Sequence, residues 1–165
     1  MPNWSKGVLK IRGKKKDIIN FLRSGIERYG YPRNGEDYTK LPLNIQYNEF
    51  GDVFCEETDE EHHSWLHFKN SRRLFVNGNI EWYFNNDENI EEIVVLDIKQ
   101  AWKIDEEYFV DTSKTYNIDF KLMTFENGCC FTQEIEVVKG KLILNRTTEY
   151  KENYAWEVYD PRLGG

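Results

Sequence analysis

Val8-Leu9-Lys10-Ile11-Arg12 is the stretch that decides the fold, because its pattern returns later in the chain as Val95-Leu96-Asp97-Ile98-Lys99. Short apolar runs of this kind predict strands, and Gly13 ends the first one. A helix is predicted after each run, over residues 14–29 and residues 105–116. The two halves of the chain therefore begin alike.

The first predicted helix places four side chains on one 3.6-residue face: Ile18, Leu22, Ile26 and Tyr29. Gly30 and Pro32 are expected to end this helix, because glycine caps a helix well and proline does not continue one. Residues 33–43 are then predicted to form a loop.

The remaining segments favour strands. In residues 63–68, Leu66 and Phe68 are expected on one face and His63, Trp65 and His67 on the other, because side chains alternate along a strand. A hairpin is predicted from residues 74–76 and 80–84, which flank Asn77-Gly78, a pair that suits tight turns. Further strands are predicted over residues 43–47, 52–56, 93–99, 118–122, 129–137 and 142–144.

A second repeated motif extends the likeness between the halves. Glu49-Phe50-Gly51-Asp52-Val53-Phe54 is echoed by Glu126-Asn127-Gly128-Cys129-Cys130-Phe131. We therefore predict an α+β, ferredoxin-like fold of duplicated βαββ-type units, with a mainly antiparallel sheet and about two main helices. An N-terminal unit, residues 1–90, and a C-terminal unit, residues 91–165, are expected to pack as one compact body.

Composition narrows the class of protein. The formal net charge is −7, whereas nonspecific nucleic-acid binders need a basic surface. Direct nucleic-acid binding is therefore not expected. No stretch approaches the roughly 20 apolar residues of a membrane span, and no signal region is visible. Three cysteines form no paired framework, which suits a reducing compartment. The expected location is the cytoplasm.

Residues at both ends of the chain resemble a known group. They are Met1-Pro2-Asn3-Trp4, the strand end Ile11-x-Gly13, the turn Phe125-Glu126-x-Gly128-x-x-Phe131, and the ending Trp156-Glu157 to Pro161-x-x-Gly164-Gly165. The chain is similar to YubB/Api-like phage and plasmid proteins with a ferredoxin-like domain. Ser5 stands where that group often has a cysteine. The resemblance implies a mobile-element accessory protein in a bacterial host cell, and it carries over no catalytic residue.

An acidic segment forms the first candidate site: Glu56, Glu57, Asp59, Glu60 and Glu61. Such a run is either a solvated loop or an acidic finger offered to a basic partner. We predict a contribution to partner binding, with Trp65 beside it as a possible aromatic anchor.

A basic cluster forms the second candidate site, a phosphate-binding one: Lys10, Arg12, Lys14, Lys15 and Lys16. These residues surround the predicted junction between the first strand and the first helix. The alternative is that they form a solvated strand end.

A metal site is not predicted. The available ligands are Cys55, His62, His63 and His67. If His63 and His67 lie on a strand, about 13 Å separates them, which is too far for one zinc ion. No cofactor is expected either.

The sequence therefore favours binding over catalysis. Common catalytic signatures are absent, and whether the protein is an enzyme stays open, with the balance against. We expect a phage- or mobile-element-encoded protein that binds a host protein or protein complex and inhibits an anti-phage defence system. The alternative is a small-molecule-binding or nucleotide-binding protein, or a hydrolase, that uses the basic cluster. The oligomeric state is not predicted.

Overall fold

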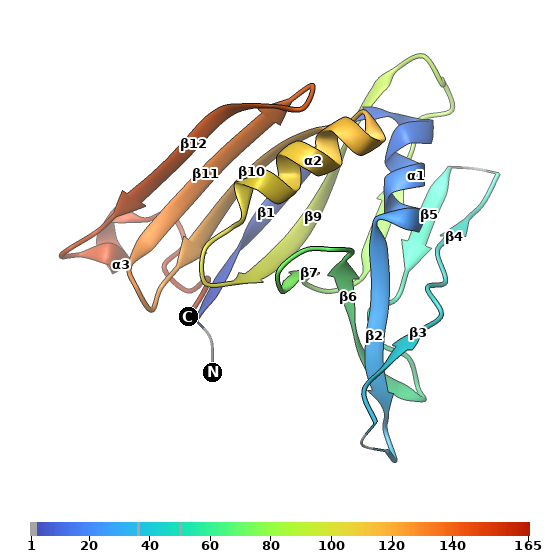
Figure 1. Ribbon diagram of the computed structural model, residues 1–165, viewed down its shortest axis with the longest axis horizontal. Coiled ribbons are helices and arrows are strands. Elements are labelled where there is room, and N and C mark those ends of the chain that lie inside the picture. Colours follow the sequence, from blue (N-terminus) through green and yellow to red (C-terminus); the bar gives the residue numbers. More distant parts are fainter. Residues whose placement is uncertain (1–2, 36, 50) are drawn as a thin grey trace.

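The computed structural model describes residues 3–35, 37–49 and 51–165 (Figure 1). Its elements are β1 (Trp4–Lys14), α1 (Lys15–Ser24), β2 (Ile26–Pro32), β3 (Thr39–Leu41), β4 (Gln46–Tyr47), β5 (Asp52–Cys55), β6 (His62–Phe68), β7 (Leu74–Val76), β8 (Ile80–Tyr83), β9 (Glu91–Ala101), α2 (Glu106–Tyr116), β10 (Asp119–Glu126), β11 (Phe131–Val138), β12 (Lys141–Glu149) and α3 (Tyr154–Glu157). Met1 and Pro2 of the family resemblance and Phe50 of the repeated motif lie outside the described residues.

The α+β class with a mainly antiparallel sheet is confirmed. In the described part of the chain, nine strands form one sheet in the order β12-β11-β10-β1-β9-β7-β6-β2-β3, and β4-β5-β8 form a second, smaller sheet. The paired strands in both sheets are antiparallel. The large sheet has more strands than a simple ferredoxin-like fold.

The first strands of the two halves lie side by side at the centre. β1 pairs with β9 along its whole length and with β10 on its other side. β7 and β6 lie between β9 and β2, so three further antiparallel pairings, β9 with β7, β7 with β6 and β6 with β2, leave β2 parallel to β1. The predicted units 1–90 and 91–165 thus contribute to one continuous sheet.

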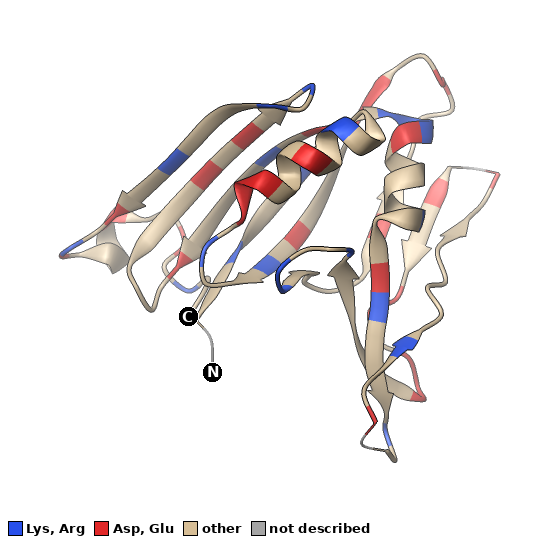
Figure 2. Cartoon of the chain, in the orientation of Figure 1, with Lys and Arg blue, Asp and Glu red and all other residues tan. Residues whose placement is uncertain are grey.

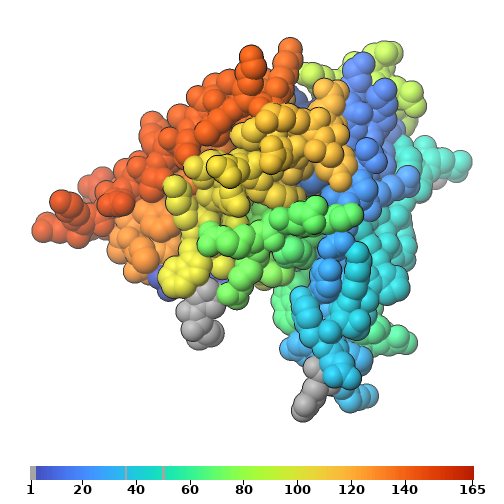
Figure 3. All heavy atoms as spheres, viewed as in Figure 1, coloured from blue at the N-terminus to red at the C-terminus, as the bar shows by residue number. Residues whose placement is uncertain are grey.

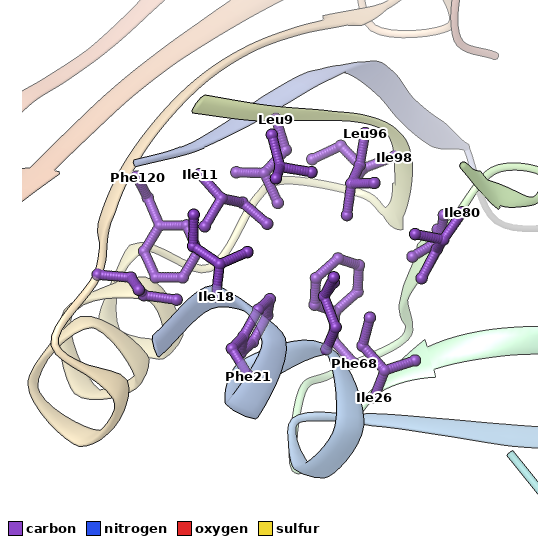
Figure 4. Packing of buried hydrophobic residues seen from close by; sticks show 14 of the residues in the cluster. Leu9, Ile11, Ile18, Phe21, Ile26, Phe68, Ile80, Leu96, Ile98 and Phe120 are labelled. Atoms are coloured by element: carbon purple, nitrogen blue, oxygen red, sulfur yellow. The ribbon is translucent and has the colours of Figure 1, made fainter. Parts of the chain in front are cut away.

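The core lies on one face of the large sheet, under α1, α2 and the small sheet. Side chains alternate along β1, so Leu9 and Ile11 point toward this face, where they meet Ile18 and Phe21 of α1 (Figure 4). Ile80 of β8 belongs to the same cluster. We call this the covered face and the opposite one the open face.

The C-terminal segment covers one end of the open face. Phe125 of β10 packs there with Tyr154 and Val158. The backbone of Gly165 exchanges two hydrogen bonds with that of Trp4, at 3.0 and 3.3 Å. The chain's end is therefore held against the start of β1.

The prediction that the first helix extends to Tyr29 is wrong. α1 ends at Ser24, where Gly25 donates its N–H to the Phe21 carbonyl at 2.7 Å. A Cβ at Gly25 would lie 2.6 Å from the Phe21 ring, so this close turn requires glycine. Ile26 to Pro32 then form β2, because pairing with β6 satisfies their backbone groups.

The predicted hairpin around Asn77-Gly78 is also wrong. β7 pairs with β6 and β9 in the large sheet, whereas β8 pairs with β5 in the small one. The turn therefore carries the chain from one sheet to the other. The predicted loop 33–43 likewise contains β3, which pairs with β2.

The duplication is not visible as two matching units. β11 pairs with β10 in the large sheet, whereas its counterpart β5 lies in the small sheet.

Within the described residues, no helix is long and apolar enough to cross a membrane.

Candidate functional site

The acidic segment is a folded loop anchored by two arginines, Arg28 within β2 and Arg33 directly after it. The carboxylate of Asp59 accepts a hydrogen bond from Arg28 at 2.7 Å, and Arg33 donates to the Asp59 carbonyl at 3.1 Å. Asp59 also accepts from the backbone N–H groups of Glu61 and His62. These interactions hold the pKa of Asp59 well below its usual range. The hydrogen bond from Arg28 has the largest effect, and those from His62 and Glu61 add to it.

The five acidic residues therefore have different environments. Asp59 and Glu57 are half-buried, and burial raises the pKa of Glu57. The Glu57 carbonyl accepts a hydrogen bond from the Ser64 hydroxyl. Glu56, Glu60 and Glu61 are exposed. Only these last three are available to an approaching partner as fully solvated charges.

Trp65 is not a core residue. Leu66 and Phe68 are fully buried in the core, and His63, Trp65 and His67 lie on the open face, as predicted from the alternation along β6. The ring of Trp65 lies 5.6 Å from Tyr31 and 6.4 Å from Tyr38. It is therefore one member of a larger aromatic group.

Aromatic rings form a continuous strip over β1, β7, β6 and β2 on the open face. Neighbouring ring centroids lie 5.1 to 6.4 Å apart along the whole series. The members are Trp4, Phe75, His67, Tyr29, Tyr38, Trp65 and Tyr31. Burial lowers the pKa of His67, so its imidazole is neutral at physiological pH.

Four rings of the strip, two from each half of the series, line a groove of about 380 Å³. We name it the aromatic groove, and it is lined by Trp4, Lys6, Tyr38, Trp65, Arg73, Phe75 and Lys99. Figure 3 looks onto the side that carries the helices and shows the segment with β2 and β3 extending away from the rest of the molecule, whereas the groove lies on the opposite, open face. None of the described residues lining the groove is acidic.

The predicted basic cluster is divided between two places. Lys14, Lys15 and Lys16 line one end of a pocket of about 570 Å³ that extends along α1 to Arg23 in its last turn and includes Tyr47. Figure 2 shows the basic segment at the beginning of α1. We name this the α1 pocket.

Lys15 is fixed within the α1 pocket. Its ammonium group lies 5.4 Å from the centre of the Tyr47 ring and donates to the Asn85 carbonyl at 3.3 Å. Glu88 and Asn89 complete the opposite wall. The start of a helix and three lysines together favour an anion at this position.

Lys10 and Arg12 lie elsewhere, on the open face of β1. Arg12 forms an ion pair with Asp119 of β10, which raises the Arg12 pKa. Lys10 and Arg12 border a much smaller depression of about 90 Å³ with Glu136. These two residues therefore do not complete the phosphate site that the sequence proposed.

The residues considered as metal ligands are not grouped. Cys55 is buried in the small sheet, and burial raises its thiol pKa to about 11, so it remains protonated at neutral pH. His62 contacts Asp59 at 3.0 Å. Across residues 3–35, 37–49 and 51–165, no group of three or more His, Cys, Asp or Glu side chains could hold a metal ion.

Sequence reasoning missed several residues of the two sites. Tyr38 fell in a predicted loop and Arg23 on a predicted helix surface, with no motif to mark either. Trp4, Phe75 and Lys99 lie far apart in the chain, and only the strand register unites them: Lys6 pairs with Lys99, and Lys99 with Phe75. Alternation placed Trp65 on the face of β6 opposite Leu66 and Phe68 and was the one available signal.

Comparison with known proteins returns no relative. No protein-family model matches the chain, and searches of curated proteins and of solved structures found no match either.

Proposed function

We propose that this is a binding protein encoded by a phage or mobile element, which engages a host macromolecule and inhibits an anti-phage defence system. The observation that carries the binding role is the aromatic groove, where Trp4, Tyr38 and Trp65 meet three cationic side chains on an otherwise acidic protein. Aromatic residues and arginine dominate binding energy at interface centres. The family resemblance is the ground for the phage origin, the host cytoplasm as location and the defence target.

A ferredoxin-like core is part of this proposal. The series β1, α1, β2, β9, α2, β10 follows a strand-helix-strand order twice. β10, β1 and β9 are neighbours, and β2 follows after the inserted β7 and β6. Without β7 and β6 the strand order would be β10-β1-β9-β2, which is the order expected of a four-stranded ferredoxin-like sheet.

The acidic segment supports the proposal in a separate way. Glu56, Glu60 and Glu61 are exposed, and exposed charges accelerate encounter with an oppositely charged partner rather than strengthen the final complex. We propose that these three residues steer a basic host protein, while Trp65 supplies contact area.

Affinity capture from a bacterial lysate tests the binding role. We expect the wild-type protein to retain a specific macromolecule that Trp65→Ala loses, because the variant removes a ring from the groove wall. Tyr83→Ala is the matched control, since Tyr83 is an exposed aromatic residue of β8 outside the groove. Circular dichroism of each variant checks that the fold is intact.

Identical captured material from wild type and Trp65→Ala would contradict a role for the groove. The target class has its own test, because expression of the protein in cells with a defence system should restore phage plating. Unchanged plating across a panel of defence systems would reject that part of the proposal.

The α1 pocket supports a second candidate function, the binding of a phosphate-bearing small molecule or nucleotide. Its lining supplies Lys14, Lys16 and Arg23 for an anion and the Tyr47 ring for a flat group. The volume of about 570 Å³ lies within the range of small-molecule sites.

A thermal-shift screen with nucleotides, cyclic dinucleotides and inorganic phosphate tests this candidate. A ligand that binds only the folded state raises the melting temperature. We expect Lys14→Ala to remove the shift and Arg12→Ala to preserve it, because Arg12 lies outside the pocket and pairs with Asp119. A shift that both variants retain would place the ligand elsewhere.

A further inference from the structure

The aromatic groove joins flat rings and cations that come from separate segments. Trp4 and Lys6 belong to β1, Trp65 to β6, Phe75 to β7 and Lys99 to β9. Tyr38 precedes β3 and Arg73 precedes β7, so two connecting segments complete the walls. The register places the lysines in one row across the open face, because Lys6 pairs with Lys99.

The rings of the groove are accessible to a flat ligand. Tyr38 is 58% exposed although one face of its ring stacks on Tyr29, with centroids 5.7 Å apart and planes at 11°. Trp4 meets Phe75 edge to face, and the guanidinium group of Arg73 lies 5.5 Å from the centre of the Trp4 ring. Aromatic rings and guanidinium planes are the groups on which unpaired nucleobases stack.

The charges in the groove are those that a phosphate backbone requires. Lys6, Arg73 and Lys99 line it, whereas Glu27 on the open face nearby is ion-paired with Lys40. The carboxyl group of Glu57 interacts electrostatically with Lys99, and burial raises the pKa of Glu57. The net charge of −7 is that of the whole chain, and at physiological ionic strength charges more than about 8 Å away are largely screened.

We propose that the aromatic groove binds single-stranded nucleic acid, with bases stacked on Tyr38 and Trp65 and phosphates contacting Lys6, Arg73 and Lys99. This inference rests on the groove being a binding surface, as in the proposed function, and it goes beyond host-protein binding by assigning the groove a second ligand class. It departs from the expectation drawn from net charge alone, which argues against direct nucleic-acid binding. A duplex hides the faces of its bases, and an acidic peptide offers carboxylates without flat rings, so neither uses both features of the groove.

Fluorescence anisotropy with labelled 12-nucleotide single strands, one of DNA and one of RNA, tests the proposal. We expect saturable binding by the protein and at least tenfold weaker binding of a duplex of the same length as the single strands. Tyr38→Ala should weaken binding by about tenfold, the loss typical of one stacked base. Tyr38→Phe retains the ring and should bind within about twofold of wild type.

Salt dependence tests the cationic wall. Lys99→Ala should lower the slope of log affinity against log salt concentration by about 0.7, because one phosphate contact on a single strand is lost. Lys141→Ala is the matched control, since Lys141 is an exposed lysine of β12 outside the groove and should leave the slope unchanged.

Three results would overturn the proposal: no binding of either single strand, equal affinity for the duplex, or full affinity in Tyr38→Ala. Displacement of the strand by an equal concentration of a free dinucleotide, or by an acidic peptide, would also overturn it. Nuclease treatment of the lysate separates the test of the proposed function from the test of the nucleic-acid inference. A protein that the groove still captures after nuclease treatment would support the proposed function, and absence of oligonucleotide binding would then reject the nucleic-acid inference alone.

Discussion

Phe21→Ala is expected to lower the free energy of unfolding by about 4 kcal/mol, a loss typical of removing a large aromatic side chain from a core. Phe21 of α1 is fully buried, and its ring packs near three rings from different elements. Its centroid lies 6.1 Å from Phe68 of β6, 5.3 Å from Tyr116 of α2 and 5.8 Å from Phe120 of β10. The variant therefore leaves a cavity where α1, α2 and the sheet meet.

Urea unfolding followed by tryptophan fluorescence measures this loss. Phe21→Leu retains most of the volume and should lose clearly less, whereas Ile90→Ala, at a 43% exposed position, should stay within about 0.5 kcal/mol of wild type. A loss below about 1 kcal/mol for Phe21→Ala would show that this ring does not join the elements as described.

Asp59→Asn is expected to lower the free energy of unfolding by about 2 kcal/mol. The variant keeps the size of the side chain but leaves the guanidinium group of Arg28, only 10% exposed, without its carboxylate. Breaking a fully buried pair in this way costs about 3 to 5 kcal/mol, and the 32% exposure of the Asp59 side chain reduces that figure. Glu60→Gln, an exposed control in the same loop, should change stability by less than about 0.5 kcal/mol.

The pH dependence of stability gives the same pair a second test. The pKa of Asp59 is lower in the folded protein than its ordinary value of 3.8, so folding gains stability from this group above pH 4. That gain should disappear as the pH falls below 4, and wild type should lose more stability than Asp59→Asn over this interval. Parallel pH profiles would mean that the carboxylate does not hold the loop.

Local pattern alone predicted much of the secondary structure. Residues 105–116 were expected as a helix and α2 spans Glu106–Tyr116, and the expected strand 93–99 lies within β9. The alternation in β6 correctly placed Leu66 and Trp65 on opposite faces, and the structure shows that Leu66 lies on the buried one. These elements are long or strongly periodic, so their burial pattern is written in adjacent residues.

Two errors arose where the local pattern fits more than one structure. The spacing of Ile26 and Tyr29 suits one face of a helix. The same segment also fits a strand, in which Ile26 and Arg28 share the buried face, and pairing with β6 selects the strand. Asn77-Gly78 marks a turn whether the flanking strands pair with each other or with different sheets. Local propensity is weaker than the free energy gained from a complete set of backbone hydrogen bonds.

The candidate sites divide in the same way between sequence and tertiary structure. The sequence by itself determined which residues carry charge and that Trp65 and Leu66 lie on opposite faces of β6. Only the tertiary structure brought Trp4, Tyr38, Trp65 and Phe75 into one groove, bound Asp59 to Arg28, and separated Lys14 from Arg12. The reason is that strand register joins residues many positions apart, and neighbouring residues in the chain carry no record of which distant strand will pair with theirs.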